Sequence, residues 1–416
     1  MGLAFDTSLV DVDLIPDGKG PPLELFARWR RDDPVHWNPP PAPGRYISRM
    51  EGTTFDKGFW VLTRYADVDA VSRDQELFSS WLGSPIIWDY SGEALERQRA
   101  GMMGMEPDRH LRTKRLVTPV FSPRAMKELE PAIAKLAAEI VDRVAATGRC
   151  EFVFDLASRL PVYTFCKLLG VPEADQELIF QLGNGAADTE NGDNDHGQVV
   201  MQLMQYAANL AAEKLTNPDN SMMSKIVNGE VDGDRLSPDE VAMFFVLLSI
   251  AGHETTRSTA VHFIRLMMEH PDQYALLRSD PETYLPNAID EVLRFSPPVI
   301  KFRRTATRDT MIGEQPIKAG DKIYLSYPAA NRDPEMFPDP DRFDITRDNA
   351  SQHLAFGVGP HRCLGARLAS LQLHHLLLQV ITRIPDFRLA GEPQFLRSIW
   401  FSAIMKMPLE FTPEAH

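Results

Sequence analysis

Apolar residues recur with helical periodicity through the middle of the chain. In residues 124–148, 198–215 and 237–270, apolar side chains return every three or four positions, which is the pattern of a helix with one buried face. Strand signals are shorter and lie nearer the ends, at residues 58–63 and at residues 321–327 and 407–412. This pattern predicts a mainly α protein with a minor β-rich region.

The segment 237–270 carries clear signals for both of its ends. Ser237 followed by Pro238 and by Glu240 is the sequence of a capped helix start, and His270 comes directly before Pro271, which cannot continue a helix. At ~1.5 Å rise per residue, such a helix is long enough to cross a whole molecule. We therefore expect one long central helix.

Two polar segments interrupt the helical patterns. The proline-rich residues 38–44 predict an extended surface segment. Residues 183–197 are acidic and contain several glycines, which fits either a solvated loop or a mobile lid over a pocket.

Composition and charge exclude several classes of protein. The chain has 416 residues, 44% of them hydrophobic, and a formal net charge of −14, which argues against nucleic acid or an anionic membrane as a main partner. The most apolar run, residues 243–252, is far shorter than the ~20 residues that span a bilayer. The first residues lack the features of a signal peptide. We expect a soluble, cytoplasmic protein without a membrane anchor.

The three cysteines, Cys150, Cys166 and Cys363, are too few and too far apart for a disulfide framework or for a zinc site of CxxC type. Cys363 stands out because it lies between a glycine-rich turn and a helical apolar pattern, within residues 353–375. A helix start favours a thiolate, and a thiolate beside closely approaching backbone can bind a metal or haem. A buried structural cysteine is the alternative, and the surrounding pattern favours the ligand.

A second candidate site lies inside the long helix, in the sequence AGHETT. Ala251 and Gly252 leave room against the helix, Thr255 can direct its hydroxyl to a carbonyl one turn earlier, and Glu254 can relay protons. The alternative is a helix with a buried polar cluster, which would leave Glu254 and Thr255 costly to bury.

These motifs together resemble the cytochrome P450 family. The sequence FGVGPHRCLG at 356–365 is similar to the haem-ligand signature of that family, and AGHETT at 251–256 is similar to its oxygen-activating motif. EVLR at 291–294 resembles the E-x-x-R pair, and PDRF at 340–343 resembles the segment whose arginine, here Arg342, completes a structural charge network. The resemblance implies one P450 domain over residues 1–416, with haem b between the long central helix and the cysteine loop.

The resemblance also implies the residues that contact the haem. Cys363 would be the iron ligand, and the propionates would be held by cations or donors at an H-x-x-x-R segment, at an R-x-A segment and in the cysteine loop. Lys114 departs from the family pattern, in which an arginine is usual, so Arg112 or Arg115 could share its task. The predicted haem-contacting set is Cys363, His110, Lys114, Arg304, His353, Phe356, His361, Ala251 and Gly365.

The implied activity is an oxygen-dependent monooxygenase that inserts one atom of O2 into a C–H bond, with Glu254 and Thr255 delivering protons. The sequence has no flavin or iron–sulfur motif, so we expect electrons from NAD(P)H through a ferredoxin reductase and a ferredoxin. Arg342, Arg362 and Arg367 could form a basic docking face or could simply be solvated. The alternatives are a peroxygenase that uses hydrogen peroxide, against which Glu254 and Thr255 argue, and a haem-binding sensor without turnover.

The predicted substrate is a bulky apolar molecule such as a steroid, a terpenoid or a similar lipid. Residues 81–105 lie where the family places a pocket-lining loop and are rich in methionine and aromatic residues, which adapt to large apolar shapes. Each predicted pocket residue could instead be part of the core. The predicted pocket is Trp81, Ile86, Ile87, Trp88, Met102, Met103, Val246, Leu247, Val299, Ile300, Phe302, Trp400 and Phe401.

Overall fold

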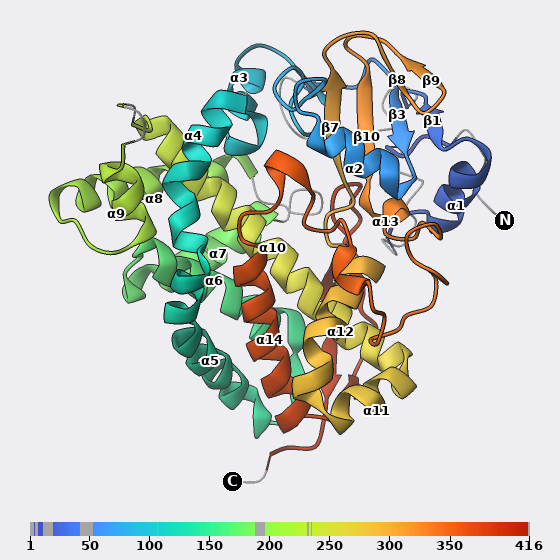
Figure 1. Cartoon of the computed structure of the whole chain (residues 1–416). Coiled ribbons are helices and arrows are strands. Elements are labelled where there is room, and N and C mark those ends of the chain that lie inside the picture. Colours follow the sequence, from blue (N-terminus) through green and yellow to red (C-terminus); the bar gives the residue numbers. More distant parts are fainter. Residues whose placement is uncertain are drawn as a thin grey trace.

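The computed structural model describes residue 4 and residues 7–10, 20–41, 53–105, 107–187, 196–230, 233 and 235–414. Helices fill most of the molecule, a smaller β-rich part lies at one side, and the longest helix runs through the helical part (Figure 1). The prediction of a mainly α protein with a minor β-rich region is confirmed.

The helices are bounded as follows in chain order: α1 (Leu23–Asp32), α2 (Tyr65–Arg73), α3 (Gly92–Ala100), α4 (Pro107–Val117), α5 (Pro123–Ala145), α6 (Arg159–Leu169), α7 (Gln176–Ala187), α8 (His196–Thr216), α9 (Met222–Asn228), α10 (Pro238–Glu269), α11 (Pro271–Ser279), α12 (Pro281–Phe295), α13 (Tyr327–Ala330) and α14 (Ala366–Arg383). The strands are β1 (Val35–Asn38), β2 (Thr53–Thr54), β3 (Phe59–Leu62), β4 (Phe78–Ser79), β5 (Asp89–Tyr90), β6 (Arg149–Glu151), β7 (Lys301–Ala306), β8 (Thr310–Ile312), β9 (Gln315–Ile317), β10 (Lys322–Ser326), β11 (Arg388–Leu389), β12 (Gln394–Phe395), β13 (Ile404–Lys406) and β14 (Pro408–Glu410).

Helix α10 begins and ends where the sequence predicts. The Ser237 side chain accepts from the backbone of Glu240 and the Glu240 side chain accepts from the backbone of Ser237, which forms a complete capping box. His270 is the C-cap, directly before α11. The helix packs against α8, α6, α12 and α14, so it forms the central axis of the helical part.

The main sheet has the strand order β1-β3-β10-β7-β4. β10 runs parallel to β3 and antiparallel to β7, and the register places Ile323 opposite Arg304. Strands β3, β10 and β14 confirm the three predicted strand segments. β7 follows α12 through a short connection and therefore brings the end of the helical part next to the sheet.

A buried charge network joins α12 to the loop before α14. Glu291 and Arg294 form a two-pronged ion pair on α12, with distances of 2.7 and 2.8 Å, and neither side chain has exposed surface. The arginine that completes this network is Arg347, whose Nε lies 3.3 Å from Glu291 Oε2. The prediction that Arg342 does so is wrong, because its side chain is 65% exposed and pairs with Asp344. Arg342 contributes its carbonyl oxygen, which accepts from Arg294 and Arg347.

The two predicted polar segments are described only in part. Helix α7 extends to Ala187 and α8 starts at His196, so residues 188–195 of the predicted lid lie outside the described residues. Residues 42–44 of the proline-rich segment also lie outside them. Within the part of the chain that is described, no helix is long and apolar enough to cross a membrane.

Candidate active site

A mainly apolar cavity lies between α10 and the loop that carries Cys363, beside β7. Its walls come from α4, α6, α10, α12, α14, β7 and the segments 85–103 and 355–365. Charged and imidazole side chains enter it at one side, and no carboxylate is among the described residues that line it.

The cysteine loop is shaped by two glycines with left-handed backbone. Gly357 has φ 63° and Gly359 has φ 71°, conformations that side-chain-bearing residues rarely adopt. A Cβ on Gly359 would also lie 2.7 Å from the carbonyl oxygen of Ser72, so the loop packs against the end of α2. The backbone N–H of Cys363 donates to the carbonyl of Phe356 at 2.8 Å, which closes the loop and turns the thiol into the cavity.

The Cys363 side chain is exposed to the cavity, yet protein surrounds it on its other sides. Desolvation by these surroundings raises its pKa, although the backbone N–H of Gly365 and the positive charges of Arg362 and Lys114 act to lower it. The expectation that a helix start lowers this pKa fails because α14 begins at Ala366, three residues later. Coordination to a metal ion deprotonates a thiol outright, so the iron itself would supply the missing stabilisation of the thiolate.

Four nitrogen-bearing side chains gather at one side of the cavity, as predicted. The rings of His110 and His361 lie 4.2 Å apart. Lys114 Nζ donates to the carbonyl of Pro360 at 2.6 Å, and the Arg304 guanidinium, which is 4% exposed, donates to a backbone carbonyl. These three contacts place the four side chains, from α4, β7 and the cysteine loop, around one space.

This cluster carries positive charge without a neighbouring acid. Burial first, and then Lys114 and Arg304, lower the pKa of His110 to about 4. Burial, followed by the charge of Arg304, also lowers the pKa of His361 to about 2. An anion in this space would relieve the mutual repulsion. The cluster therefore fits the propionates of a haem, and Cys363 fits its iron.

His353 is placed differently from the other predicted haem contacts. Its Nε2 lies 3.7 Å from Asp290 of α12, its Nδ1 accepts from the backbone of Ala355, and it does not line the cavity. It therefore supports the cysteine loop from behind. Phe356, Gly365 and Ala251 do line the cavity, whereas Arg112 and Arg115 do not.

Helix α10 presents the AGHETT residues on two different faces. Ala251, Gly252 and Thr255 line the cavity, and the Thr255 hydroxyl donates to the carbonyl of Ala251 at 2.7 Å. A Cβ on Gly252 would meet no atom within 4 Å, so this stretch of the helix leaves open space. The predicted position of Thr255 beside an open part of the helix agrees with the structure.

Glu254 lies on the other face of α10. It has no exposed surface, pairs with Arg257 one turn later and accepts a hydrogen bond of 3.0 Å from Ser258. It is not among the residues that line the cavity. A proton that passes from Glu254 to the cavity therefore requires the carboxyl to leave Arg257 or a relay through intervening water.

Only part of the predicted substrate pocket lines the cavity. Met102, Met103, Leu247, Val299 and Phe302 do so. The remaining predicted residues pack elsewhere: Trp81 lies under Arg99, Ile87 and Val246 belong to core clusters, Trp88 and Trp400 stack on each other, and Ile86, Ile300 and Phe401 are also absent from the wall.

The cavity wall also contains apolar residues that the sequence analysis missed. They come from the end of the 3-10 turn η3 (Thr118–Phe121), from α6 and from the first half of α10, and they are Phe121, Pro161, Phe165, Leu168, Phe244 and Leu248. Two of them, Phe244 and Leu248, lie on the same face of α10 as the predicted Leu247. The helical periodicity around position 247 was therefore a signal that could have predicted them.

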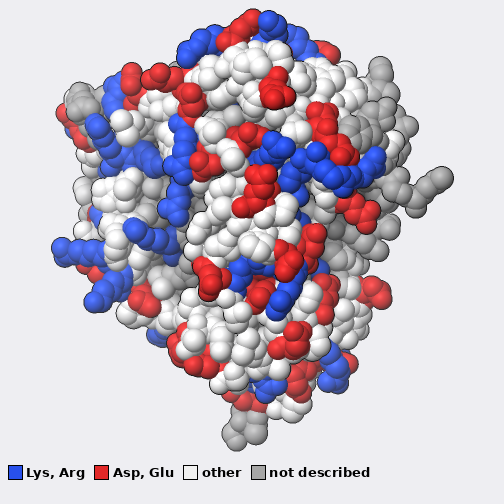
Figure 2. All heavy atoms as spheres, turned by 45° about the vertical axis from the view of Figure 1, so that its right-hand side comes forward, with Lys and Arg blue, Asp and Glu red and all other residues white. Residues whose placement is uncertain are grey.

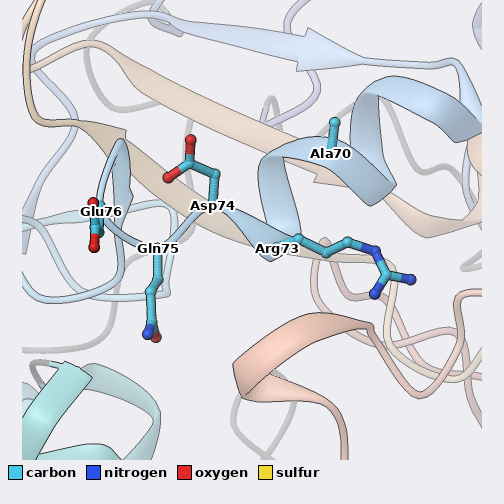
Figure 3. A pocket seen from close by; sticks show the side chains of 5 residues that line it. All are labelled: Ala70, Arg73, Asp74, Gln75 and Glu76. Atoms are coloured by element: carbon cyan, nitrogen blue, oxygen red, sulfur yellow. The ribbon is translucent and has the colours of Figure 1, made fainter.

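A second pocket lies at the C-terminal end of α2 and is open to solvent (Figure 3). Its labelled residues are Ala70, Arg73, Asp74, Gln75 and Glu76. Arg73 pairs with Asp69 at 2.7 Å, so its charge is already matched. This pocket borders the backbone that supports Gly359 but has no arrangement of groups for catalysis.

Comparison with known proteins identifies the class of this site. Residues 193–390 match the family model described as cytochrome P450. The chain is 35% identical to a steroid C26-monooxygenase of Mycolicibacterium smegmatis over 94% of this chain and 91% of that protein. It is 33% identical to a methyl-branched lipid omega-hydroxylase of Mycobacterium tuberculosis, over 93% and 90% respectively. A cytochrome P450 of Mycobacterium marinum, solved in complex with pseudoionone, superposes with a TM-score of 0.85 at 36% identity and covers 93% of this chain and 94% of that one.

The chain belongs to the cytochrome P450 family. It is a cytochrome P450 monooxygenase, and membership implies a haem iron with a thiolate ligand, O2 as co-substrate and a redox partner that supplies electrons.

Proposed function

We propose that this monooxygenase hydroxylates a bulky apolar lipid, of steroid, terpenoid or branched-chain type. The observation that carries the proposal is the division of the cavity wall: cations and imidazoles gather around the His110 cluster, whereas the wall along α6 and the first half of α10 is apolar. A substrate held by that wall gains binding energy from buried apolar area and finds no partner for a charge. The names of the relatives from M. smegmatis and M. tuberculosis point to the same class of substrate.

The residues of this chain would act as follows. Cys363 would ligate the iron of haem b, and His110, Lys114, Arg304 and His361 would hold the propionates. A thiolate-ligated haem iron supplies the binding and cleavage of O2. Thr255, whose hydroxyl lies at the cavity wall, would hold a proton donor there, and Glu254 would supply protons from the far face of α10 after it leaves Arg257. The whole chain would work as one haem domain.

Electrons would reach the haem from NAD(P)H through a reductase and a ferredoxin. Arg362 and Arg367 are exposed beside Cys363, and Arg342 is exposed on the loop before them. On the face drawn in Figure 2, basic and acidic side chains are interspersed, so attraction of an acidic partner would depend on a local group of this kind.

The first test is the spectrum of the reduced, carbon-monoxide-bound protein. The native chain should show the band of thiolate ligation, and Cys363→Ser should lose it. Cys166→Ser is the matched control, because Cys166 is fully buried in a core cluster and is not among the residues that line the cavity, and it should keep the band. Retention of the thiolate band in Cys363→Ser would refute the ligand assignment.

The substrate class is tested by titrating the ferric protein with four sets of compounds: steroids, terpenoids, straight-chain fatty acids and small polar aromatics. Displacement of a water ligand by an apolar substrate changes the spin state, so binding can be followed by absorbance. We expect micromolar dissociation constants, or about −8 kcal/mol, for members of the first two sets. Tight binding of small polar or charged compounds alone would contradict the proposal.

A further inference from the structure

The side chains of strand β7 alternate between the cavity and the opposite face of the sheet. Phe302 and Arg304 line the cavity, whereas Lys301 and Arg303 do not. Successive side chains of a strand point to opposite faces, so Arg303 lies behind the residue that faces the haem space. What Arg303 holds there is the segment 83–90, which leads from the sheet to α3.

Arg303 contacts this segment along its length. Its side chain is 5% exposed, and one nitrogen donates to the carbonyl of Trp88 at 2.9 Å and to Asp89 at 3.3 Å. Its backbone N–H donates to the carbonyl of Pro85 at 2.7 Å. A Cβ on Gly83 would lie 2.0 Å from the guanidinium, so the chain approaches as closely as a glycine allows.

Asp89 connects the segment to a second cation on the neighbouring strand. Its other carboxylate oxygen accepts from Lys322 of β10 at 2.7 Å, and Lys322 is 2% exposed. One carboxylate therefore pairs with two buried cations, and it joins the small β2–β5 sheet to the main sheet. Burial lowers the pKa of Lys322 to about 8 and that of Arg303 to about 10, and the charge of Asp89 opposes this shift at both groups.

The held segment forms part of the cavity wall. Pro85 lines the cavity, and the segment leads through α3 to the 3-10 turn η2 (Met102–Gly104), whose Met102 and Met103 also line it. Arg99, at the end of α3, donates to the carbonyl of Trp81 at 3.1 Å and so ties the far end of this wall back to its start. Release of Asp89 would remove the ion pairs of this segment with Arg303 and Lys322 and leave its hydrogen bonds to Arg303 at Pro85 and Trp88.

We propose that Arg303 and Lys322, bridged by Asp89, are positioning residues that hold segment 83–90 closed against the sheet and thereby set the rate at which ligands enter and leave the haem cavity. The inference rests on the haem cavity of the proposed function but not on its substrate class. The proposal assigns control of ligand entry and release to charged side chains that do not line the cavity.

The test compares Asp89→Asn with Asp309→Asn in the haem-loaded full chain. Asp89→Asn keeps the shape and removes the charge that both cations need. Asp309 makes a similar contact to a lysine, at 2.8 Å, but both partners are more than 60% exposed on the β8–β9 hairpin. The probe is 4-phenylimidazole, a neutral apolar azole whose ring nitrogen ligates haem iron whatever the natural substrate is.

Two quantities are measured for each variant: hydrogen exchange of the backbone amides in 83–90 and the dissociation rate of the azole. Asp89→Asn should speed both by roughly tenfold, the size typical of losing one positioning contact, while amides of α12 and α14 stay protected. Asp309→Asn should change neither. Unchanged exchange and dissociation in Asp89→Asn would overturn the proposal, and so would faster exchange throughout the molecule, because that marks a merely structural role.

Lys322→Met serves where Asp89→Asn does not retain haem. It removes one cation, keeps the Asp89 contact with Arg303 and should speed azole dissociation by about threefold. An azole dissociation rate equal to that of the native chain in this variant would likewise overturn the proposal. Because the azole reports on the cavity alone, failure of every steroid to bind would refute the substrate class and leave these results interpretable.

Discussion

Thr255 and Glu254 are adjacent in sequence but lie in different environments. The Thr255 hydroxyl is at the cavity wall and is oriented by the carbonyl of Ala251, whereas Glu254 is buried with Arg257 on the opposite face. The sequence predicted the residue types, because their chemistry belongs to a recognisable motif. It did not predict that an ion pair holds the acid, because i, i+3 pairing with Arg257 depends on burial of both side chains.

The first residue-level prediction concerns Thr255→Ala. This variant should bind haem and substrate as the native chain does, because the hydroxyl contacts only its own helix. It should consume electrons without equivalent product and release hydrogen peroxide, because a positioned proton donor contributes about 10²–10⁴-fold to a proton-dependent step. The measurement is product formed and peroxide released per electron consumed.

Thr382→Ala is the matched control for that variant. The Thr382 hydroxyl makes the same contact on α14, with the carbonyl four residues earlier at 2.7 Å, but it is exposed and outside the cavity. It should keep the native ratio of product to electrons. Tightly coupled turnover in Thr255→Ala would show that the hydroxyl has no part in proton delivery.

At the scale of single elements, the ends of a helix could be predicted where residues close in sequence determine them. Helix α10 has its own cap, first-turn proline and stop, so its ends follow from neighbouring residues. The cavity wall was predictable only in part, because Trp88 and Trp400 lie about 310 residues apart in sequence and turn toward each other, away from the cavity. Such pairing depends on tertiary contacts that periodicity does not encode.

The charge network of α12 yields a prediction about stability. Arg347 is 9% exposed, contacts Glu291 and donates to three backbone carbonyls of the loop before α14, whereas the Arg342 side chain lies in solvent. Arg347→Ala should lower the free energy of unfolding by about 3–5 kcal/mol, because it leaves a buried carboxylate partly unpaired. Arg342→Ala should lower it by less than about 1 kcal/mol.

Denaturant unfolding of the two haem-loaded variants measures this difference. Retention of haem should follow the same order, because the network holds the loop that leads to Cys363. Equal effects of the two substitutions would contradict the conclusion that Arg347, rather than Arg342, completes the network.

At the scale of the whole molecule, the net charge of −14 opposes the approach of an acidic ferredoxin. Surface charges are screened over ~10 Å at 0.1 M salt, so a partner that comes close responds to local charges instead. Arg362 and Arg367 are exposed next to the Cys363 loop, where the thiolate end of an electron path would reach the surface. The basic group formed by Arg362 and Arg367 is therefore small. Each of these two charges should have a large effect on the rate of association with the redox partner.

Reversal of one of these charges tests the docking site. Arg367→Glu should reduce the second-order rate of reduction by an acidic [2Fe–2S] ferredoxin by roughly tenfold at low salt, because steered association depends on the sign of nearby charge. The control is Arg388→Glu on β11, which follows the far end of α14; that helix end, at Arg383, lies ~24 Å along the axis from Arg367. The difference between the variants should shrink as ionic strength rises, while haem content and azole binding stay native. An equal slowing in both variants, or one that salt does not diminish, would place the ferredoxin on another face of the molecule.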